Sequence, residues 1–155
     1  MDKSFTFLKG KKCSKSASVF EALGDLDELN ATLGLARAFA KKNLKQKILW
    51  LQNDLIEIGG FLSGAKKVNL KEKAALLEEK IKQMTNSSVK TFSRPGANKS
   101  SAFLHLARAV CRRLERRVVG LKKTQFKTLI TYLNHLSSFL FWLAKKHEKI
   151  GSLQT

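Results

Sequence analysis

The sequence predicts an all-α protein, a five-helix antiparallel bundle. Leucine and isoleucine recur every three or four residues in five segments, and most connections between these segments are short and polar. One proline and nine glycines are too few for a turn-rich β protein. A chain of 155 residues can bury one core, so we expect a single domain over 1–155, with a basic segment at 1–18 ahead of a bundle at 19–149.

The first two helices are predicted by apolar spacing over residues 19–42 and 46–62, with Asn43 between them. Gly59 and Gly60 near the end of the second helix either weaken its last turn or permit a close contact there.

The later helices have clearer boundaries. Asn69, followed three residues later by Glu72, resembles a capping box and opens a third helix that extends to Met84. A polar loop with the single proline follows, and the last two helices are expected over 100–122 and 125–149.

The fourth predicted helix carries two stripes that meet. Its apolar seam is formed by Leu104, Ala107, Cys111, Leu114 and Val118. A second stripe lies one position further around the helix and consists of His105, Arg108, Arg112 and Glu115. Charged groups beside a buried seam are costly unless they are paired or bound to an anion. The pattern therefore indicates arginines that hold phosphates or a buried carboxylate.

The chain is strongly basic, with 30 Lys+Arg, 12 Asp+Glu and a net charge of +18. The lysines are scattered, many of them where helices should end, and no zinc finger, helix-turn-helix or RNA-binding aromatic motif is present. Nucleic-acid binding is therefore not expected as the primary function. General basicity suits anionic ligands.

Other features place the protein in the cytoplasm. Cys13 and Cys111 are too few for a disulfide framework, and no His/Cys cluster has zinc-ligand spacing. No apolar run is long enough to span a membrane, and the N-terminal residues do not resemble a signal peptide, so no membrane partner is expected.

Four separated motifs carry a family resemblance. They are GDLDELNATLGLARA at 24–38, LQNDLIEIGGFL at 51–62, FSRPGANKSSAFLHLARAVCRRLERRVV at 92–119 and YLNHLSSFLFWLAK at 132–145. In this order they cover nearly the whole chain, and they resemble the PduO-type ATP:cob(I)alamin adenosyltransferases.

The resemblance implies a fold, an assembly and a reaction. The family has a five-helix bundle and is usually a homotrimer with active sites between subunits. Its members transfer the 5′-deoxyadenosyl group of ATP to the cobalt of a corrinoid and release tripolyphosphate. The resemblance therefore implies ATP, Mg²⁺ and cobalamin as ligands, and an external reductase as the source of cobalt(I).

The resemblance also assigns roles to individual residues. Arg108 matches an arginine that pairs with the aspartate of the first motif, here Asp27. Phe92 matches the aromatic residue at the lower face of the corrin cobalt. The expected ATP contacts are Lys15, Arg112, Glu115 and Asn134.

One family motif is incomplete. The family opens with a phosphate-binding loop resembling T-R-T-G-D-x-G-x-T, whereas residues 2–6 of this sequence correspond only to its second half, with Ser4 in place of glycine. We therefore expect lysines near the N-terminus (Lys9, Lys11, Lys12 and Lys15) to share the triphosphate with Arg112.

Simpler roles are expected for the remaining candidates. Cys111 should be a small core residue, and His147 should be exposed. Packing or helix-edge positions are expected for His105 and His135, and solvated or interface positions for Arg113, Arg116 and Arg117. Core packing is the default for Phe139, Phe141 and Trp142, and a corrin-facing wall is the alternative.

The sequence is compatible with three functions: the adenosyltransferase itself, a family member without catalysis that binds corrinoid or nucleotide, and a basic helical module that binds a polyanion. The combined presence of the charged stripe and the family motifs favours the first.

Overall fold

The computed structural model describes residues 4–15, 17–85 and 94–151. It confirms the all-α five-helix bundle. The helices are α1 (Ser18–Ala38), α2 (Lys42–Leu62), α3 (Leu70–Thr85), α4 (Lys99–Gly120) and α5 (Lys127–Gly151), with a short 3₁₀ helix, η1 (Thr124–Phe126), before the last.

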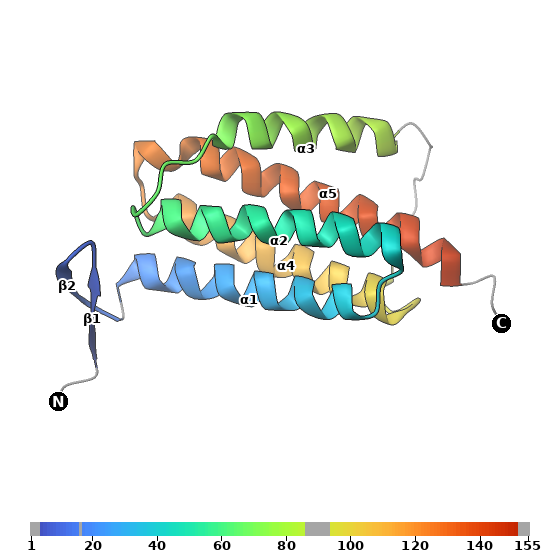
Figure 1. The fold of residues 1–155 in the computed structure, drawn as a ribbon, viewed down its shortest axis with the longest axis horizontal. Helices are drawn as coiled ribbons and strands as arrows, with labels where there is room; N and C mark the ends of the chain where they lie inside the picture. Colours follow the sequence, from blue (N-terminus) through green and yellow to red (C-terminus); the bar gives the residue numbers. More distant parts are fainter. Residues whose placement is uncertain (1–3, 16, 86–93, 152–155) are drawn as a thin grey trace.

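The five helices run side by side along one long axis (Figure 1). Helix α4 packs against both α1 and α5, while α2 packs beside α1 and α3 beside α5. Each helix buries leucines in one shared core, for example Leu29, Leu51, Leu77, Leu114 and Leu133. Burial of these apolar side chains is the main stabilising contribution to the fold.

Two polar caps fix the starts of α3 and α4. Asn69 Oδ1 accepts a hydrogen bond from the Glu72 backbone N–H at 3.3 Å, and Asn69 Nδ2 donates to Glu72 Oε2 at 2.9 Å, which confirms the predicted cap. Asn98 caps α4 by accepting from the Ser101 N–H at 2.9 Å. Its amide also donates to the His147 carbonyl at 2.9 Å and so ties α4 to the end of α5.

The predicted boundary between the first two helices is wrong by one turn. Helix α1 ends at Ala38 and α2 begins at Lys42, not at Gln46. Phe39 leaves the helical conformation and stacks on Phe103 of α4, with the ring centroids 5.9 Å apart. The earlier start of α2 buries Leu44 in the core.

The N-terminal segment contains a β-hairpin that the sequence analysis missed. Strand β1 (Phe5–Leu8) pairs antiparallel with β2 (Lys11–Ser14), and the hairpin projects from the bundle beside the start of α1 (Figure 1). Lys9 and Gly10 form the two-residue turn with φ values of 49° and 73°. Positive φ at both positions is the geometry of a type I′ turn, which glycine favours.

The glycine pair in α2 permits close packing, one of its two predicted roles. A Cβ on Gly60 would lie 3.1 Å from Lys66 Cβ, closer than an ordinary contact, whereas a Cβ on Gly59 would make an ordinary van der Waals contact with Leu26 Cδ2 of α1 at 3.4 Å. Within the described residues, no helix has both the length and the apolar character needed to cross a membrane.

Candidate active site

A surface pocket between α4 and α5 gathers the predicted arginines. It has a volume of about 280 Å³, and its lining residues are Arg108, Arg112, Ser137, Ser138, Phe141 and Trp142. Ala107 and Cys111, the residues that precede the two arginines in α4, are fully buried, so the arginines border the buried seam of this helix. Two cations, two hydroxyls and two aromatic rings suit a ligand that carries both an anionic group and a flat apolar group.

Three of the four predicted ATP-binding residues form one hydrogen-bonded network at the rim of this pocket. Arg112 Nη1 donates to Glu115 Oε2 at 2.6 Å, and Asn134 Nδ2 donates to Glu115 Oε1 at 3.2 Å. Glu115 thus orients one side chain from α4 and one from α5. The Arg112 side chain is 46 % exposed, which leaves its remaining N–H groups available to an anion.

The fourth predicted ATP contact lies elsewhere in the chain. Lys15 is exposed at the end of the hairpin, where its backbone N–H donates to the Ser4 carbonyl at 2.9 Å. No described contact joins Lys15 to the pocket of its own chain. Phe92, the predicted corrin-facing residue, falls outside the described residues.

The predicted Asp27–Arg108 pair does not form within the chain. Asp27 is exposed on α1, and Arg108 is partly buried at the pocket, with its Nε buried and without a hydrogen-bond partner. Among the described residues, neither side chain takes part in an ion pair.

A different carboxylate occupies the interface between α1 and α4. Asp25 is 6 % exposed, and it accepts hydrogen bonds from Arg113 Nε at 3.0 Å and from Arg117 Nε at 2.6 Å. Glu21 and Glu28 pair with the outer ends of the same arginines. Arg113 and Arg117 therefore clamp α4 to α1. The sequence-based prediction for both is a solvated or interface position, without this role.

The sequence carried a signal for this clamp. Asp25 lies on the seam of α1, three residues after Ala22 and four before Leu29, both of which are fully buried. A carboxylate at a seam position requires cations on the facing helix. Arg113 and Arg117, which are four residues apart on α4, supply these cations.

The aromatic candidates on α5 have different roles. Phe139 is buried, and its ring meets Trp50 edge-on at 6.1 Å, so it is a core residue. Phe141 and Trp142 instead line the pocket, in edge-to-face contact with each other at 5.4 Å.

The histidines are engaged in packing or hydrogen bonds. His105 is buried and its Nε2 lies 2.6 Å from Glu148 Oε1, while His135 Nδ1 lies 3.1 Å from the Ala74 carbonyl. The prediction that His147 is exposed is wrong. This side chain is half-buried with its Nε2 unpartnered, and burial together with the charges of Lys47 and Lys146 lowers its pKa.

A second buried carboxylate belongs to the core. Asp54 of α2 accepts hydrogen bonds from Tyr132 Oη at 3.0 Å and from Lys73 Nζ at 2.6 Å. Burial and the charge of Asp54 raise the pKa of Tyr132 well above its usual value. This network joins α2, α3 and α5, and sequence spacing alone did not indicate it. Cys111 is a core residue as predicted, with a thiol pKa raised by burial.

No group of three or more His, Cys, Asp or Glu side chains in the described part of the chain could hold a metal ion. Glu115 is the carboxylate at the rim of the pocket. Mg²⁺ commonly binds through one or two carboxylates together with substrate phosphates. Glu115, which holds Arg112 at the pocket, would offer one carboxylate to a magnesium ion bound with a phosphate ligand.

The bundle and its cationic pocket define the class of protein to which the chain is similar. The cobalamin adenosyltransferase family matches residues 2–147, and the chain belongs to this family. The match confirms the resemblance predicted from the four motifs.

Curated relatives and solved structures agree with this assignment. The chain is 36% identical to a corrinoid adenosyltransferase of Bacillus subtilis (93% of this chain, 81% of the relative) and 32% identical to a cobalamin adenosyltransferase of Cupriavidus metallidurans (92% and 81%). It superposes with a TM-score of 0.88 and 27% identity on an arginine-to-lysine variant of a PduO-type ATP:co(I)rrinoid adenosyltransferase from Lactobacillus reuteri complexed with ATP (97% of this chain, 93% of that one).

A phenylalanine-to-alanine variant of the PduO-type enzyme from Lactobacillus reuteri, complexed with cobalamin and ATP, gives the same TM-score of 0.88 at 26% identity, covering 97% of this chain and 92% of that one. With relatives of this similarity over most of its length, the protein is an enzyme of the corrinoid adenosyltransferase type.

Proposed function

We propose that this protein transfers the 5′-deoxyadenosyl group of ATP to cob(I)alamin or a related corrinoid, using the pocket between α4 and α5. The observation that carries this proposal is the Arg112–Glu115–Asn134 network, which presents an oriented cation beside a pocket with aromatic walls. Family membership and the ATP and cobalamin complexes of similar structures support it.

The reaction requires ATP and the corrinoid to be positioned against each other, and it requires no side-chain base. A lone pair of cobalt(I) attacks the 5′ carbon, a cobalt–carbon bond forms, and the C5′–O bond breaks with its electron pair leaving on tripolyphosphate. Arg112 stabilises the negative charge that develops on this leaving group. Glu115 holds Arg112 and Asn134 in place, so that little reorganisation is needed when the charge develops.

The same proposal assigns the remaining ligands. Mg²⁺ accompanies the triphosphate and partly neutralises it. Lys15 and its neighbours in the hairpin contribute further positive charge, and Phe92 faces the corrin. The external reductase supplies cobalt(I), and the two free thiols, Cys13 and Cys111, suit a reducing cytoplasm.

A homotrimer would complete the site. Asp27, Ala31 and Leu35 form an exposed stripe along α1, and Leu35 is 47 % exposed although it is apolar. Burial of this stripe against α4 of a neighbouring subunit would bring Asp27 to Arg108, which forms no ion pair with any described residue of its own chain. The hairpin lysines of one subunit could then reach the pocket of another.

An anaerobic assay tests the proposed reaction. The protein is mixed with ATP, Mg²⁺ and chemically reduced cobalamin, and the absorbance of cob(I)alamin is followed. We expect its ATP-dependent loss, with adenosylcobalamin and tripolyphosphate as the products. If the protein binds ATP and cobalamin without forming either product, the non-catalytic alternative is correct.

A further inference from the structure

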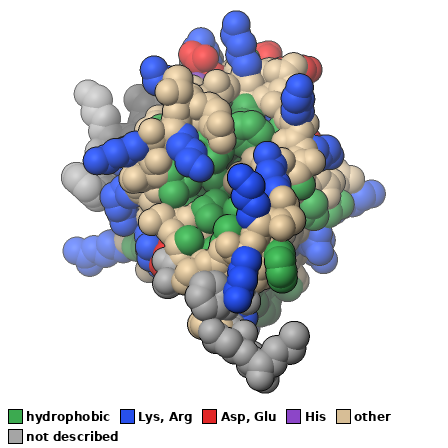
Figure 2. All heavy atoms as spheres, turned by 90° about the vertical axis from the view of Figure 1, so that its left-hand side faces the viewer, with side chains coloured by type: hydrophobic (Ala, Val, Ile, Leu, Met, Phe, Trp, Pro, Cys, Tyr) green, Lys and Arg blue, Asp and Glu red, His purple; other side chains and the backbone are tan. Residues whose placement is uncertain are grey.

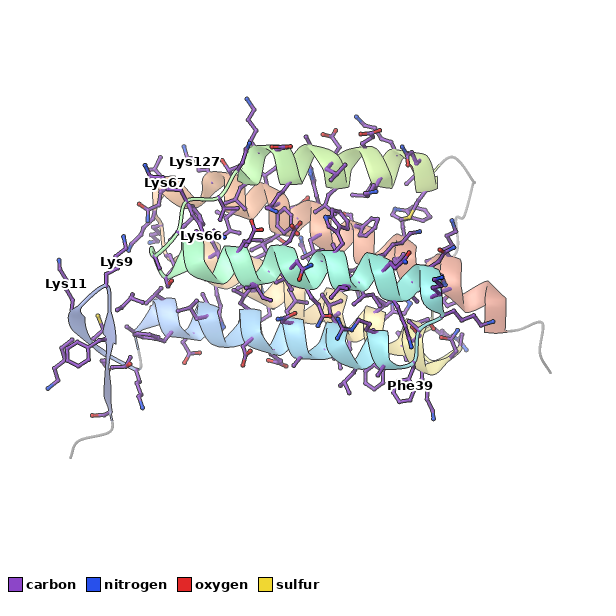
Figure 3. The ribbon with its side chains drawn as sticks, in the orientation of Figure 1. Lys9, Lys11, Phe39, Lys66, Lys67 and Lys127 are labelled. Atoms are coloured by element: carbon purple, nitrogen blue, oxygen red, sulfur yellow. The ribbon has the colours of Figure 1, made fainter. Side chains whose placement is uncertain are left out.

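Lysines that are scattered along the sequence gather at one end of the bundle. The hairpin (4–15), the α2–α3 connection (63–71) and the α4–α5 connection (120–128) meet there, as Figure 3 shows for Lys9, Lys11, Lys66, Lys67 and Lys127. These segments hold four, three and three lysines, ten in all, and neither aspartate nor glutamate. We name this surface the lysine end.

The lysine end is not neutralised by neighbouring acids. Four of its lysines take part in no ion pair within the part of the chain that the structure describes, namely Lys66, Lys67, Lys122 and Lys123. The acids at the starts of the adjoining helices are engaged elsewhere, Glu21 with Arg117 and Glu72 with Asn69. An unscreened cluster of like charges on one face produces a strong local potential.

The centre of this face is apolar. Figure 2 views the molecule from this side and shows hydrophobic side chains in the middle with Lys and Arg side chains around and between them. Phe61, Val68 and Leu121 come from the two connections or the helix turns beside them and are only partly buried. Phe7 on the hairpin is 71 % exposed.

We infer that the lysine end docks on an anionic phospholipid surface. Long lysine stems can lie along apolar surface while their ammonium groups reach phosphates, and the apolar centre can meet the boundary between headgroups and acyl chains. Basic residues close to an anionic membrane each contribute to binding in an additive, salt-sensitive way. The enzyme would be a peripheral membrane protein through the lysines of the two helix connections, while the hairpin lysines serve the triphosphate as proposed above.

The composition of the lysine end favours lipid over two other polyanions. Protein interfaces are enriched in arginine and depleted in lysine, yet all ten cations of the three segments are lysines. A nucleic acid would use the charges but would gain little from a central apolar surface. A fluid layer of headgroups can use both.

Vesicle co-sedimentation tests this inference. The wild-type protein is mixed with vesicles of phosphatidylcholine containing phosphatidylglycerol, and with vesicles of phosphatidylcholine alone, at low and high salt. The test variant carries Lys66→Gln, Lys67→Gln, Lys122→Gln and Lys123→Gln. The matched control carries Lys41→Gln, Lys42→Gln, Lys45→Gln and Lys99→Gln, which remove the same charge from the opposite end of the bundle.

We expect wild type and control to bind only the anionic vesicles, with affinity that falls as salt rises. Each lysine removed from the lysine end should weaken binding about 5-fold, and the four together by on the order of 100-fold or more. Thermal unfolding and adenosyltransferase activity of both variants should match wild type, because none of these lysines lies at the pocket.

Two results would overturn the inference. One is an equal loss of vesicle binding in test and control variants, which would show only a general effect of net charge. The other is absence of binding to anionic vesicles at low salt, and if the lysine end then governs binding to duplex DNA, its partner is a nucleic acid.

Discussion

At the scale of single residues, the site depends on which polar groups are paired inside the chain and which are left to a ligand. Glu115 accepts a hydrogen bond from one N–H group of Arg112 and leaves the other N–H groups of that arginine to a ligand. Asp25 instead accepts hydrogen bonds from two arginines and so joins α1 to α4. Arg113 and Arg117 each pair with two acids of α1, whereas among the described residues Arg112 forms an ion pair with Glu115 alone, so the number of acids around an arginine separates the structural positions from the proposed ligand-binding one.

His147 is a residue whose environment predicts a pH effect. Its pKa is lowered in the folded protein by burial and by Lys47 and Lys146, so the unfolded chain binds a proton more readily. Stability from this group is fully present above the ordinary histidine pKa of about 6.5 and is lost as pH falls below it. We expect His147→Gln to lose less stability than wild type between neutral and mildly acidic pH.

The measurement compares the urea denaturation midpoints of wild type and His147→Gln, each at neutral and at mildly acidic pH. The other histidines are common to both, so the difference between the two proteins isolates His147. An identical decrease in the two proteins would mean that His147 is solvated.

At the scale of helices, packing depends on polar clamps as well as on the apolar seams. The clamp on Asp25 joins α1 to α4, and the Asp54 network joins α2, α3 and α5. In the Asp54 network, burial alone would lower the pKa of Lys73. Hydrogen bonds and negative charges from Asp54 and Glu57 outweigh this effect of burial and raise the pKa of Lys73.

Asp25→Asn should destabilise the fold, because it leaves two arginines facing a neutral amide at a buried position. The expected loss is about 2–3 kcal/mol, below the range for a fully buried pair, since the arginine side chains are 38 % and 39 % exposed. Chemical denaturation measures it, and Glu79→Gln on the exposed side of α3 is the control for charge. A loss no larger than the control's would show that the clamp contributes nothing.

The helices were predictable and the details between them were not. Apolar spacing located all five helices, because a helix that faces a core must repeat its apolar residues. The hairpin was missed because its strands are four residues each and carry mixed polar and apolar side chains. The absence of an Asp27–Arg108 pair among the described residues of one chain has a geometric cause: Asp25 and Asp27 are two positions apart, about 200° around the helix, so only one of them can face α4 of the same chain.

The candidate site was predictable in part. The stripe on α4 indicated that arginines border the core, but their spacing alone could not reveal that Asn134 of α5 meets Glu115. That contact depends on the register of α5 against α4, and only the four-motif resemblance pointed to it.

At the scale of the whole molecule, the proposed site is shared between chains. Among the described residues of one chain, Asp27 and Arg108 form no ion pair, and the residues that line the pocket all come from α4 and α5. Light scattering should therefore give the mass of three 17.4-kDa chains. Asp27→Arg or Arg108→Asp alone should weaken the trimer through like charges, and the double variant should restore it.

A monomer at micromolar concentration, with and without ATP, would exclude the shared site. Failure of the double variant to recover the trimer, with each single variant still folded, would show that the two residues do not meet.

The most direct test of the central claim compares two arginines of α4 in the anaerobic transfer assay. Arg112→Ala should lower the rate of adenosylcobalamin formation about 100-fold and raise the ATP requirement, because Arg112 stabilises the leaving triphosphate. Arg116→Ala, an exposed position one turn further along the same helix, should leave both unchanged. Equal rates for the two folded variants would contradict the assignment of this pocket as the site of adenosyl transfer.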